Sequence, residues 1–556
     1  MKTQKIPYEE ITFEKMGVDV DKLDEHTTQA FFQLFNMMDV LIADNKTLTE
    51  EILGLKKEIA ELKGEQGKPD IPGNNRQKTD ISSENERKKS AHKNGRHKHK
   101  KALAATSDPI PLSVNEDELP PDAVYKGTRP FFVQEIELVP TVIQYDRDYW
   151  YSPSRQKSYF APLPGSVDGV FGPKLKALIL ECKHSFDMTE GKIHTMFTGH
   201  GVDISIASID RIINEDKEEF HREKTRIVVE GLKHSLFAHL DATAARMLGE
   251  NWHTFVLVTS LMAAYFTEKH KNRLTILSFL QFGKLTFYYD EEADILLETL
   301  RVSKKTVSKL RAVPRNTFLT QEEIDKLIPQ DIGRNTRTRL LEALAISAYH
   351  HQTRVPVIAI LIVDDAPEFK LVARYLQLCW VHEGRLYKKM LPELPLHKTC
   401  LSGFLTWYWE FYDKLILYRK KPTGEKAAAL RREFREKLSE GSVYGALKER
   451  QEKTLAKEEE LLLVLRFPQI AIQNNLAERR ARHPVRKRDI SFQTRTVEST
   501  RVQDTFLTIV ETAKLHGVNV YDYFYDRISK TYALASLADL ICAKGKKRPS
   551  GILSPP

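Results

Sequence analysis

Two aspartates follow apolar runs that have the character of buried strands. Asp241 comes directly after residues 236–240, and Asp364 comes directly after residues 355–363, both runs being rich in β-branched or aromatic residues. Carboxylates that follow such strands lie at the carboxyl edge of a sheet, where the functional sites of open α/β folds gather. We therefore expect both aspartates at that edge.

A third acid, Glu478, follows Asn474 and Asn475, which predict a helix start with asparagine caps. Three converging carboxylates without a His or Cys cluster suit hard cations, above all Mg²⁺, with Mn²⁺ as an alternative. Two such ions about 4 Å apart would activate an attacking oxygen and stabilise a leaving one in phosphodiester chemistry. Because the chain has 76 Asp and Glu, the spacing of these three acids alone is weak evidence for a metal site. The prediction depends on the residues that surround each acid.

Length and composition limit the class of protein. The 556 residues predict several domains, and apolar runs well short of the ~20 residues of a membrane helix predict a soluble chain. Without an N-terminal secretory signal, we expect a cytoplasmic protein. Four cysteines without CxxC spacing indicate reduced thiols, and the net charge of +9 indicates a polyanionic partner.

A heptad repeat near the N-terminus predicts a parallel coiled-coil homodimer. Its d positions are leucines, and its a positions are two isoleucines and one asparagine: Leu41, Leu48, Leu55 and Leu62 at d, and Asn45, Ile52 and Ile59 at a. Ile at a and Leu at d favour two strands, and a buried Asn fixes their register. The alternative is an amphipathic helix packed on its own domain.

Residues 64–104 lack an apolar period, which indicates a disordered linker. Its basic run, Arg87 to Lys101, could hold DNA phosphates non-specifically or serve as a solubilising tether. Three short helices are predicted next: Pro173 opens the first, residues 188–198 form the second, and Ser205 caps the third after a glycine-containing turn. This pattern is typical of a helix-turn-helix, although small helical bundles share it.

Beyond residue 237, strand-length apolar runs at 254–259 and 262–266 are followed by helical stretches at 290–350 and 404–466. The alternation predicts a mixed sheet covered by helices.

Several motifs resemble those of the insertion-sequence sixty-six family of bacterial transposases, over most of the chain. Residues 474–482, NNLAERRAR, look like the Asn-Asn-x-x-Glu-Arg signature of that family, and residues 509–518 look like its closing helix. Residues 241–246, DATAAR, look like the first-aspartate motif. The second-aspartate strand and the element after it are similar to residues 364–369, DDAPEF, and 379–385, CWVHEGR.

The resemblance implies an RNase H-like core in which Asp241, Asp364 and Glu478 are catalytic and bind two Mg²⁺ ions. Members of the family are DDE transposases that cut element ends and join the freed 3′-hydroxyl to target DNA. In-line attack by water and then by that hydroxyl requires no covalent enzyme intermediate. The implied partners are double-stranded DNA and a second copy of the chain, and the implied location is the bacterial nucleoid.

Three departures distinguish this chain from typical members. The cysteine-rich zinc ribbon of the family is missing, because residues 63–181 contain no cysteine. About seventy residues, Tyr288 to Arg354, are inserted before the second aspartate. Asp365 is an alternative to Asp364, which we prefer because its distance to Phe369 matches the family pattern.

Basic residues near these motifs are candidate DNA contacts. His382 and Arg385 could approach the scissile phosphate, although a capped helix or a core histidine is an equal alternative. A basic stretch that could grip the DNA backbone follows the glutamate: Arg479, Arg482, Arg486, Lys487 and Arg488. Cys379 and Trp380 are expected to pack. The aromatic residues between 407 and 412 could stack on bases, but core packing is favoured.

We therefore expect an α/β multidomain chain with an N-terminal coiled coil, a helix-turn-helix and an RNase H-like mixed-sheet core with helical insertions. The expected divisions are a coiled coil at 1–63, a basic linker at 64–125, the helix-turn-helix region at 126–225, core segments at 226–290, 353–403 and 473–545, helical insertions at 291–352 and 404–472, and a tail at 546–556. The expected function is DNA transposition. The alternatives are a catalytically inactive DNA-binding regulator and a nuclease that cuts without strand transfer.

Overall fold

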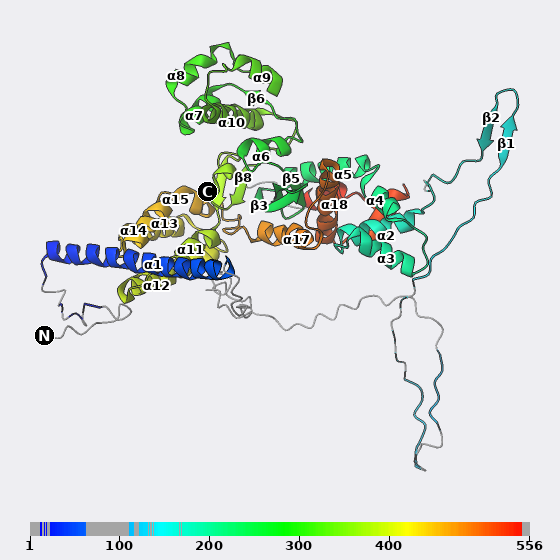
Figure 1. The fold of residues 1–556 in the computed structure, drawn as a ribbon, viewed down its shortest axis with the longest axis horizontal. Coiled ribbons are helices and arrows are strands. Elements are labelled where there is room, and N and C mark those ends of the chain that lie inside the picture. The colour runs from blue at the N-terminus through cyan, green and yellow to red at the C-terminus, as the bar shows by residue number, and fades with distance from the viewer. Residues whose placement is uncertain are drawn as a thin grey trace.

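A five-stranded mixed sheet lies at the centre of the computed structural model (Figure 1). The structure describes residues 12–13, 16, 18, 23–62, 110–115, 120, 122–129, 131, 133, 136, 138–165, 167 and 169–546. The strand order is β5-β4-β3-β8-β9. The strands are β3 (Phe237–Met247), β4 (Glu250–Val258), β5 (Ala263–Glu268), β8 (Ile360–Val363) and β9 (Tyr375–Leu378). Strands β3 to β5 form an antiparallel meander, and β8 and β9 run parallel to β3.

Both faces of this sheet are covered by helices, because alternate residues of β4 are buried on opposite sides. Val256 and Val258 pack with Ala477 of α17 (Asn475–Ser491) and Leu507 of α18 (Val497–His516). Phe255, on the other face, lies 5.2 Å from the ring of Phe279 in α6 (Arg273–Leu280). The expectation of a mixed sheet covered by helices is confirmed.

The outer edge of the sheet is covered by α18. Backbone amides of β5 donate to side chains one helical turn apart: Thr267 to Asp504 at 2.6 Å, Tyr265 to Thr508 at 3.2 Å and Ala263 to Thr512 at 3.3 Å. Four residues of helix rise about as far as two residues of strand, so the two rows stay in step. The helix thereby satisfies the open amides that an edge strand exposes.

Two features of the sheet differ from the sequence-based expectation. Asp241 does not end the first strand, because β3 continues to Met247, paired with β4 and, at Met247, bridged to Thr494. The β3 residues beyond Asp241 alternate between partly buried and exposed positions, so the sequence shows no continuous run of apolar residues there. The short strand β9 was not predicted.

Helices occur where the helix-turn-helix was expected. Pro173 is the first residue of α2 (Pro173–His184), α3 spans Glu190–Gly199, and Ser205 caps α4 (Ile206–Asn214) by accepting the amide of Ser208 at 3.1 Å. These helices pack against α18 and α19 (Val520–Ile528). Helices α5 (Glu218–Lys233) and α20 (Leu537–Lys546) pack together and against α18.

A β-hairpin precedes these helices, and the sequence did not predict it. Strands β1 (Tyr149–Ser152) and β2 (Lys157–Phe160) pair antiparallel and project away from the helices (Figure 1). Most of its side chains are exposed.

The expected insertion before β8 is largely helical and forms a separate lobe (Figure 1). Its elements are β6 (Phe287–Tyr288), α7 (Glu291–Thr299), α8 (Lys304–Val307), η5 (Ser308–Ala312), β7 (Phe318–Leu319), α9 (Gln321–Leu327) and α10 (Arg334–His351). The buried Arg273 of α6 joins the lobe to the core, because it binds Glu342 of α10 and the carbonyls of Pro367 (2.7 Å) and Lys370 (2.7 Å).

The second expected insertion, residues 404–472, is part of a helical lobe that follows β9 and begins earlier, within the segment 353–403 that was expected to belong to the core. It contains α11 (Trp380–Lys388), α12 (Pro395–Tyr418), α13 (Gly424–Ser439), α14 (Gly445–Leu455), α15 (Glu458–Leu461) and α16 (Leu463–Arg466). The short η6 (Pro367–Phe369) lies between β8 and β9.

The predicted coiled-coil segment is one helix, α1 (Glu25–Leu62), which lies against this lobe (Figure 1). Asp39 accepts the amides of Glu393 (2.7 Å) and Leu394 (2.9 Å), and Asn36 bonds to Val443 and Gly445. The packed-helix alternative therefore describes the first half of α1.

The described residues of the heptad seam lie on the other side of α1. Lys46 of α1 also contacts the lobe, because it pairs with Glu393. Leu41 and Leu48 follow Asp39 and Lys46 by two residues each, which turns their side chains about 200° around the helix, away from the lobe. Their side chains are more than half exposed, as is that of Leu55. The side chains of Ile59 and Leu62, the linker with its Arg87–Lys101 run, and residues 547–556 lie outside the described residues. Among the helices that the structure describes, none is both long and apolar enough to cross a membrane.

Candidate active site

Strand pairing brings the two aspartates together. In the parallel ladder, Phe237 pairs with Ile360 and His239 pairs with Ile362. The same register carried two residues further places Asp241 beside Asp364, which directly follows the fully buried β8. The two acids thus lie at the carboxyl edge of neighbouring parallel strands, although 123 positions separate them in the sequence.

Glu478 reaches the same edge from α17, which packs across β3 and β4. The glutamate lies in the first turn of this helix, and its amide donates to the carbonyl of Asn474 at 3.1 Å. Its side chain is 19% exposed. One of its carboxylate oxygens, Oε1, is buried without a hydrogen-bond partner.

The electrostatic environment of Asp241 indicates that the three carboxyl groups are close enough to interact. The pKa of Asp241 is raised to about 6, mainly by burial, and the negative charges of Asp364 and Glu478 contribute to the increase. The amide of Ala242, which donates to Asp241 at 2.8 Å, and the ammonium of Lys271 act in the opposite direction. Asp241 therefore lies in a site where negative charge accumulates without full compensation.

Asp365 has a different environment from Asp364. Its carboxylate pairs with Lys370 at 2.8 Å and with Lys457. Burial acts to raise the pKa of Asp365, but the two lysines outweigh burial and the pKa is lowered. Two cations already neutralise this carboxylate, whereas Asp364 accepts a 3.3 Å bond from the amide of Ala366 and lies beside Asp241.

His382 and Arg385 lie close to Glu478. They lie three residues apart on α11 and face the start of α17. Arg385 donates to Glu478 Oε2 at 3.4 Å, and His382 Nδ1 lies 3.5 Å from Glu478 Oε1. The guanidinium also contacts His382 Nε2 at 3.2 Å. Both side chains are about 30% exposed, so a substrate phosphate can reach them.

Asn474 has a positioning role, which differs from the capping role that was predicted from the sequence. Its side chain was expected to cap α17, but it makes no cap hydrogen bond. Instead its amide donates to the carbonyl of Leu240 at 2.9 Å and its oxygen contacts His239 Nδ1 at 3.0 Å. The fully buried Asn474 thus joins the strand residue before Asp241 to the helix that carries Glu478. The Asn-Asn pair before the glutamate was the available signal.

The basic stretch of α17 divides into exposed and buried members. Arg479, Arg482 and Arg486 are exposed, and their spacing of three and four residues places them along one side of the helix. Lys487 is only 2% exposed and donates to the carbonyl of Lys183 at 2.9 Å, which corrects its expected role as a DNA contact. Arg488 donates to the carbonyl of Ala244.

The expectation that Cys379 and Trp380 pack is met, since both are buried. Burial raises the pKa of the Cys379 thiol to about 11, and its sulfur accepts the amide of Asn474 at 3.1 Å. Of the aromatic set, Tyr408, Phe411 and Tyr412 are also buried, as favoured.

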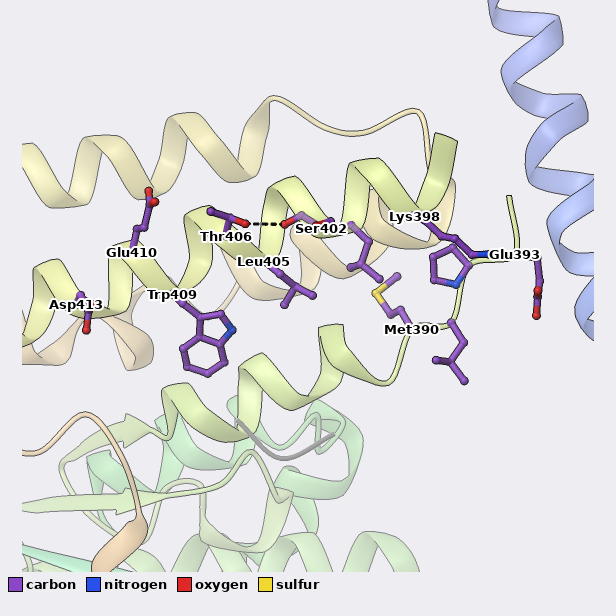
Figure 2. Close-up of a pocket in the computed structure, with 12 residues that line it drawn as sticks. Met390, Glu393, Lys398, Ser402, Leu405, Thr406, Trp409, Glu410 and Asp413 are labelled. Carbon is purple, nitrogen blue, oxygen red and sulfur yellow. Dashed lines mark hydrogen bonds between the residues drawn. The ribbon is translucent and has the colours of Figure 1, made fainter. Parts of the chain in front are cut away.

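Trp409, in contrast, lines an open groove of about 810 Å³ along α12 (Figure 2). Met390 and Leu405 provide apolar walls, and Glu393 and Glu410 lie among the polar residues of the lining. None of the three carboxylates lines this groove. Gly384 of α11 packs on the other side of Trp409, where an added Cβ would lie 2.7 Å from the indole ring.

The donor set fits a hard divalent cation. All three donors are carboxylates, the ligand type that Mg²⁺ prefers, Glu478 Oε1 has no hydrogen-bond partner, and the raised pKa of Asp241 indicates uncompensated negative charge at that residue. The oxygens of the three groups do not all lie within 4.8 Å of one another, and the cluster that includes Glu478 consists of Cys379, His382 and Glu478. A bound cation would have to draw the carboxylates together.

Comparison with known proteins agrees with this geometry. Residues 351–501 match the sequence model of the Transposase IS66 family, and this region includes Asp364, Arg385 and Glu478. An uncharacterized protein of Sinorhizobium fredii, y4jO, is 28% identical over 320 residues, which cover 56% of this chain and 98% of y4jO. Over residues 351–501, this chain is therefore similar to the Transposase IS66 family.

Proposed function

We propose that this protein is a metal-dependent DNA transposase that cuts the ends of its element and joins the freed 3′-hydroxyl to target DNA. One observation carries the proposal: the parallel register of β3 and β8 puts Asp241 beside Asp364, and the charges of Asp364 and Glu478 both act on Asp241. The family match supports a transposase-type function for the region that holds two of the three acids.

The core is proposed to be RNase H-like. Three antiparallel strands followed by two strands parallel to the first support this assignment, as does the order β5-β4-β3-β8-β9. The positions of the acids also support it: the first lies on β3, the second directly follows β8, and the third lies on the helix that packs across the meander.

Asp241, Asp364 and Glu478 are proposed to hold two Mg²⁺ ions. Bound there, the ions would activate the attacking oxygen and stabilise the leaving one. The protein groups then have positioning roles: Asn474 sets the distance between β3 and α17, and Arg385 is placed to bind a non-bridging phosphate oxygen. Asp364 is the proposed second acid because Asp365 is already paired with two lysines.

DNA is proposed to lie along the exposed side of α17. Arg479, Arg482 and Arg486 form a row that begins directly after Glu478, which suits contacts to successive backbone phosphates. Helix α4 is the proposed recognition helix of a helix-turn-helix, because its Asp210 and Arg211 are exposed to solvent. The exposed seam of α1 is proposed to pair two copies of the chain.

The proposal is tested with a supercoiled plasmid that carries the DNA flanking the gene. Wild-type protein with Mg²⁺ should nick at fixed positions and form joined products, and EDTA should abolish both reactions. Glu478→Gln should lower cleavage at least about 100-fold, because one metal-binding carboxylate is lost, while DNA binding persists. Asp489→Asn, an exposed acid on the same helix, is the matched control and should cut normally.

Each other result has a definite meaning. Unchanged cleavage by Glu478→Gln would remove this residue from the catalytic set. Metal-dependent nicks without joined products would identify a nuclease that lacks strand transfer. Tight, salt-sensitive binding without any cutting would identify a DNA-binding regulator.

A further inference from the structure

A second cluster of metal-ligand side chains, which includes none of the three proposed catalytic acids, lies between α5 and α20. Glu230 lies in the last turn of α5, His234 is the residue that directly follows this helix, and Cys542 faces them from α20. Their ligand atoms all lie within 4.8 Å of one another. All three residues are half-buried, so that a cation from solvent can reach them.

A glycine fixes the orientation of the histidine ring. Gly545 lies one turn after Cys542 on α20, and a Cβ added there would lie 2.5 Å from both Cβ and Cγ of His234 and 2.7 Å from Nδ1. The imidazole therefore packs directly on the α20 backbone through its Nδ1 side. Its Nε2 atom is left on the side of Glu230.

The polar atoms converge without pairing. His234 Nε2 lies 3.2 Å from Glu230 Oε2, yet this buried nitrogen makes no hydrogen bond because the groups are not aligned for one. The other carboxylate oxygen, Oε1, is 4.0 Å from Lys233. A simple ion pair would align the N–H with the oxygen. A nitrogen and an oxygen that lie this close without an aligned hydrogen bond are placed so that a cation could bind to both.

We propose that Glu230, His234 and Cys542 bind a zinc ion that fastens the C-terminal helix α20 to α5. Thiolate, imidazole and carboxylate together select zinc over magnesium, and zinc sites often combine three protein ligands with a water molecule. On binding, the thiol proton would be released to solvent. Helix α5 leads directly into the strand that carries Asp241, so the site would brace the base of the core.

The test is a titration of the chelator-treated full-length protein with Co²⁺ in excess Mg²⁺, which keeps Co²⁺ away from the carboxylate site. Wild type should develop thiolate-to-cobalt charge-transfer absorption that saturates at one Co²⁺ per chain and disappears when Zn²⁺ is added. Cys542→Ser should lose the band, and His234→Gln should weaken binding by at least about tenfold. Zn²⁺ should raise the melting temperature of wild type but not of Cys542→Ser.

Matched variants distinguish this site from the other thiols and from the carboxylate site. Cys400→Ser, which removes a thiol outside the cluster, and Glu478→Gln should both keep the band. Gly545→Ala should weaken binding because the new methyl displaces the ring, whereas Gly403→Ala, where nothing lies within 4 Å, should not. The proposal is overturned if wild type shows no saturable thiolate band, or if Cys542→Ser retains it.

Discussion

Asp241 illustrates how a proposed catalytic residue can lower the stability of the folded protein. An acid with a raised pKa is less stable in its ionised form in the folded protein than in the unfolded chain. The contribution of Asp241 therefore falls as the pH rises from its ordinary pKa of 3.8 to about 6, and at neutral pH the metal-free protein bears the full penalty. A divalent cation would relieve this penalty.

We expect Asp241→Asn to stabilise the metal-free protein at neutral pH by about 1–3 kcal/mol, since the amide carries no charge. The free energy of unfolding, measured by urea denaturation in EDTA, checks this value. Mg²⁺ should stabilise wild type but not the variant.

The control is Asp365→Asn, which should destabilise the protein because Asp365 compensates Lys370 and Lys457. A less stable Asp241→Asn protein in EDTA would contradict the assignment of uncompensated charge to this site.

Helix α1 has two different sides, one bonded to the helical lobe and one exposed, which its sequence pattern did not distinguish. Its Asn36 and Asp39 bond to the helical lobe, which a solitary coiled coil would not require. Leucines and isoleucines that keep the heptad remain exposed on the opposite side. An exposed apolar stripe of this kind marks an interaction surface.

We expect Leu48→Glu to weaken self-association, because it places a charge in the middle of the exposed seam. Sedimentation velocity should show a dimer for wild type and a concentration-dependent shift to monomer for the variant. Thr47→Glu, an exposed neighbour outside the seam, should behave as wild type does. Equal association of Leu48→Glu and wild type would rule out the proposed coiled coil.

Across the whole molecule, a buried ionic network connects the α2–α3 region with the core helices. His483 of α17 bonds to Asp187, which precedes α3, and to Glu511 of α18, each at 3.1 Å. Arg480 also pairs with Glu511. Such a network fixes the position of the proposed DNA-binding helices relative to the proposed active site.

The network should make stability depend on pH at both ends. Burial acts to raise the pKa of Glu511, but His483 and Arg480 outweigh it and lower the pKa from 4.5 to about 2. Its stabilisation is complete above about pH 4.5 and is lost as the pH falls toward about 2. The pKa of His483 is raised, against the effect of burial, by Asp187 and Glu511, so its contribution is lost as the pH rises above about 6.5.

We expect Glu511→Gln to lower stability at neutral pH by about 3–5 kcal/mol, because it leaves buried cations without a partner. The variant should also lose less further stability than wild type between about pH 4.5 and 2. Chemical unfolding at a series of pH values measures both effects. Glu498→Gln, at a glutamate whose side chain is 55% exposed, should change little, and parallel acid curves for Glu511→Gln and wild type would contradict the role of Glu511.

Local features were predictable from the sequence because they depend on neighbours along the chain. The apolar run before Asp364 formed the buried β8, and Ser205 capped a helix as its type and position indicated. Helical stretches in the insertions followed from their composition. The family motifs identified the three acids before any geometry was known.

Tertiary structure alone decided how these features combine, because the forces concerned act between distant segments. Parallel register places Asp241 beside Asp364, and a side-chain bond from Asn474 to Leu240 joins the third acid to them. Lys487 belongs to a uniformly basic stretch of sequence, but it is buried in the fold and its neighbours Arg482 and Arg486 are not. Asp365 differs from Asp364 because it pairs with Lys370 and Lys457. Desolvation of a side chain and its pairing with a distant residue leave no periodic pattern in the sequence. The sequence therefore determined the types of these residues, and the fold determined their environments.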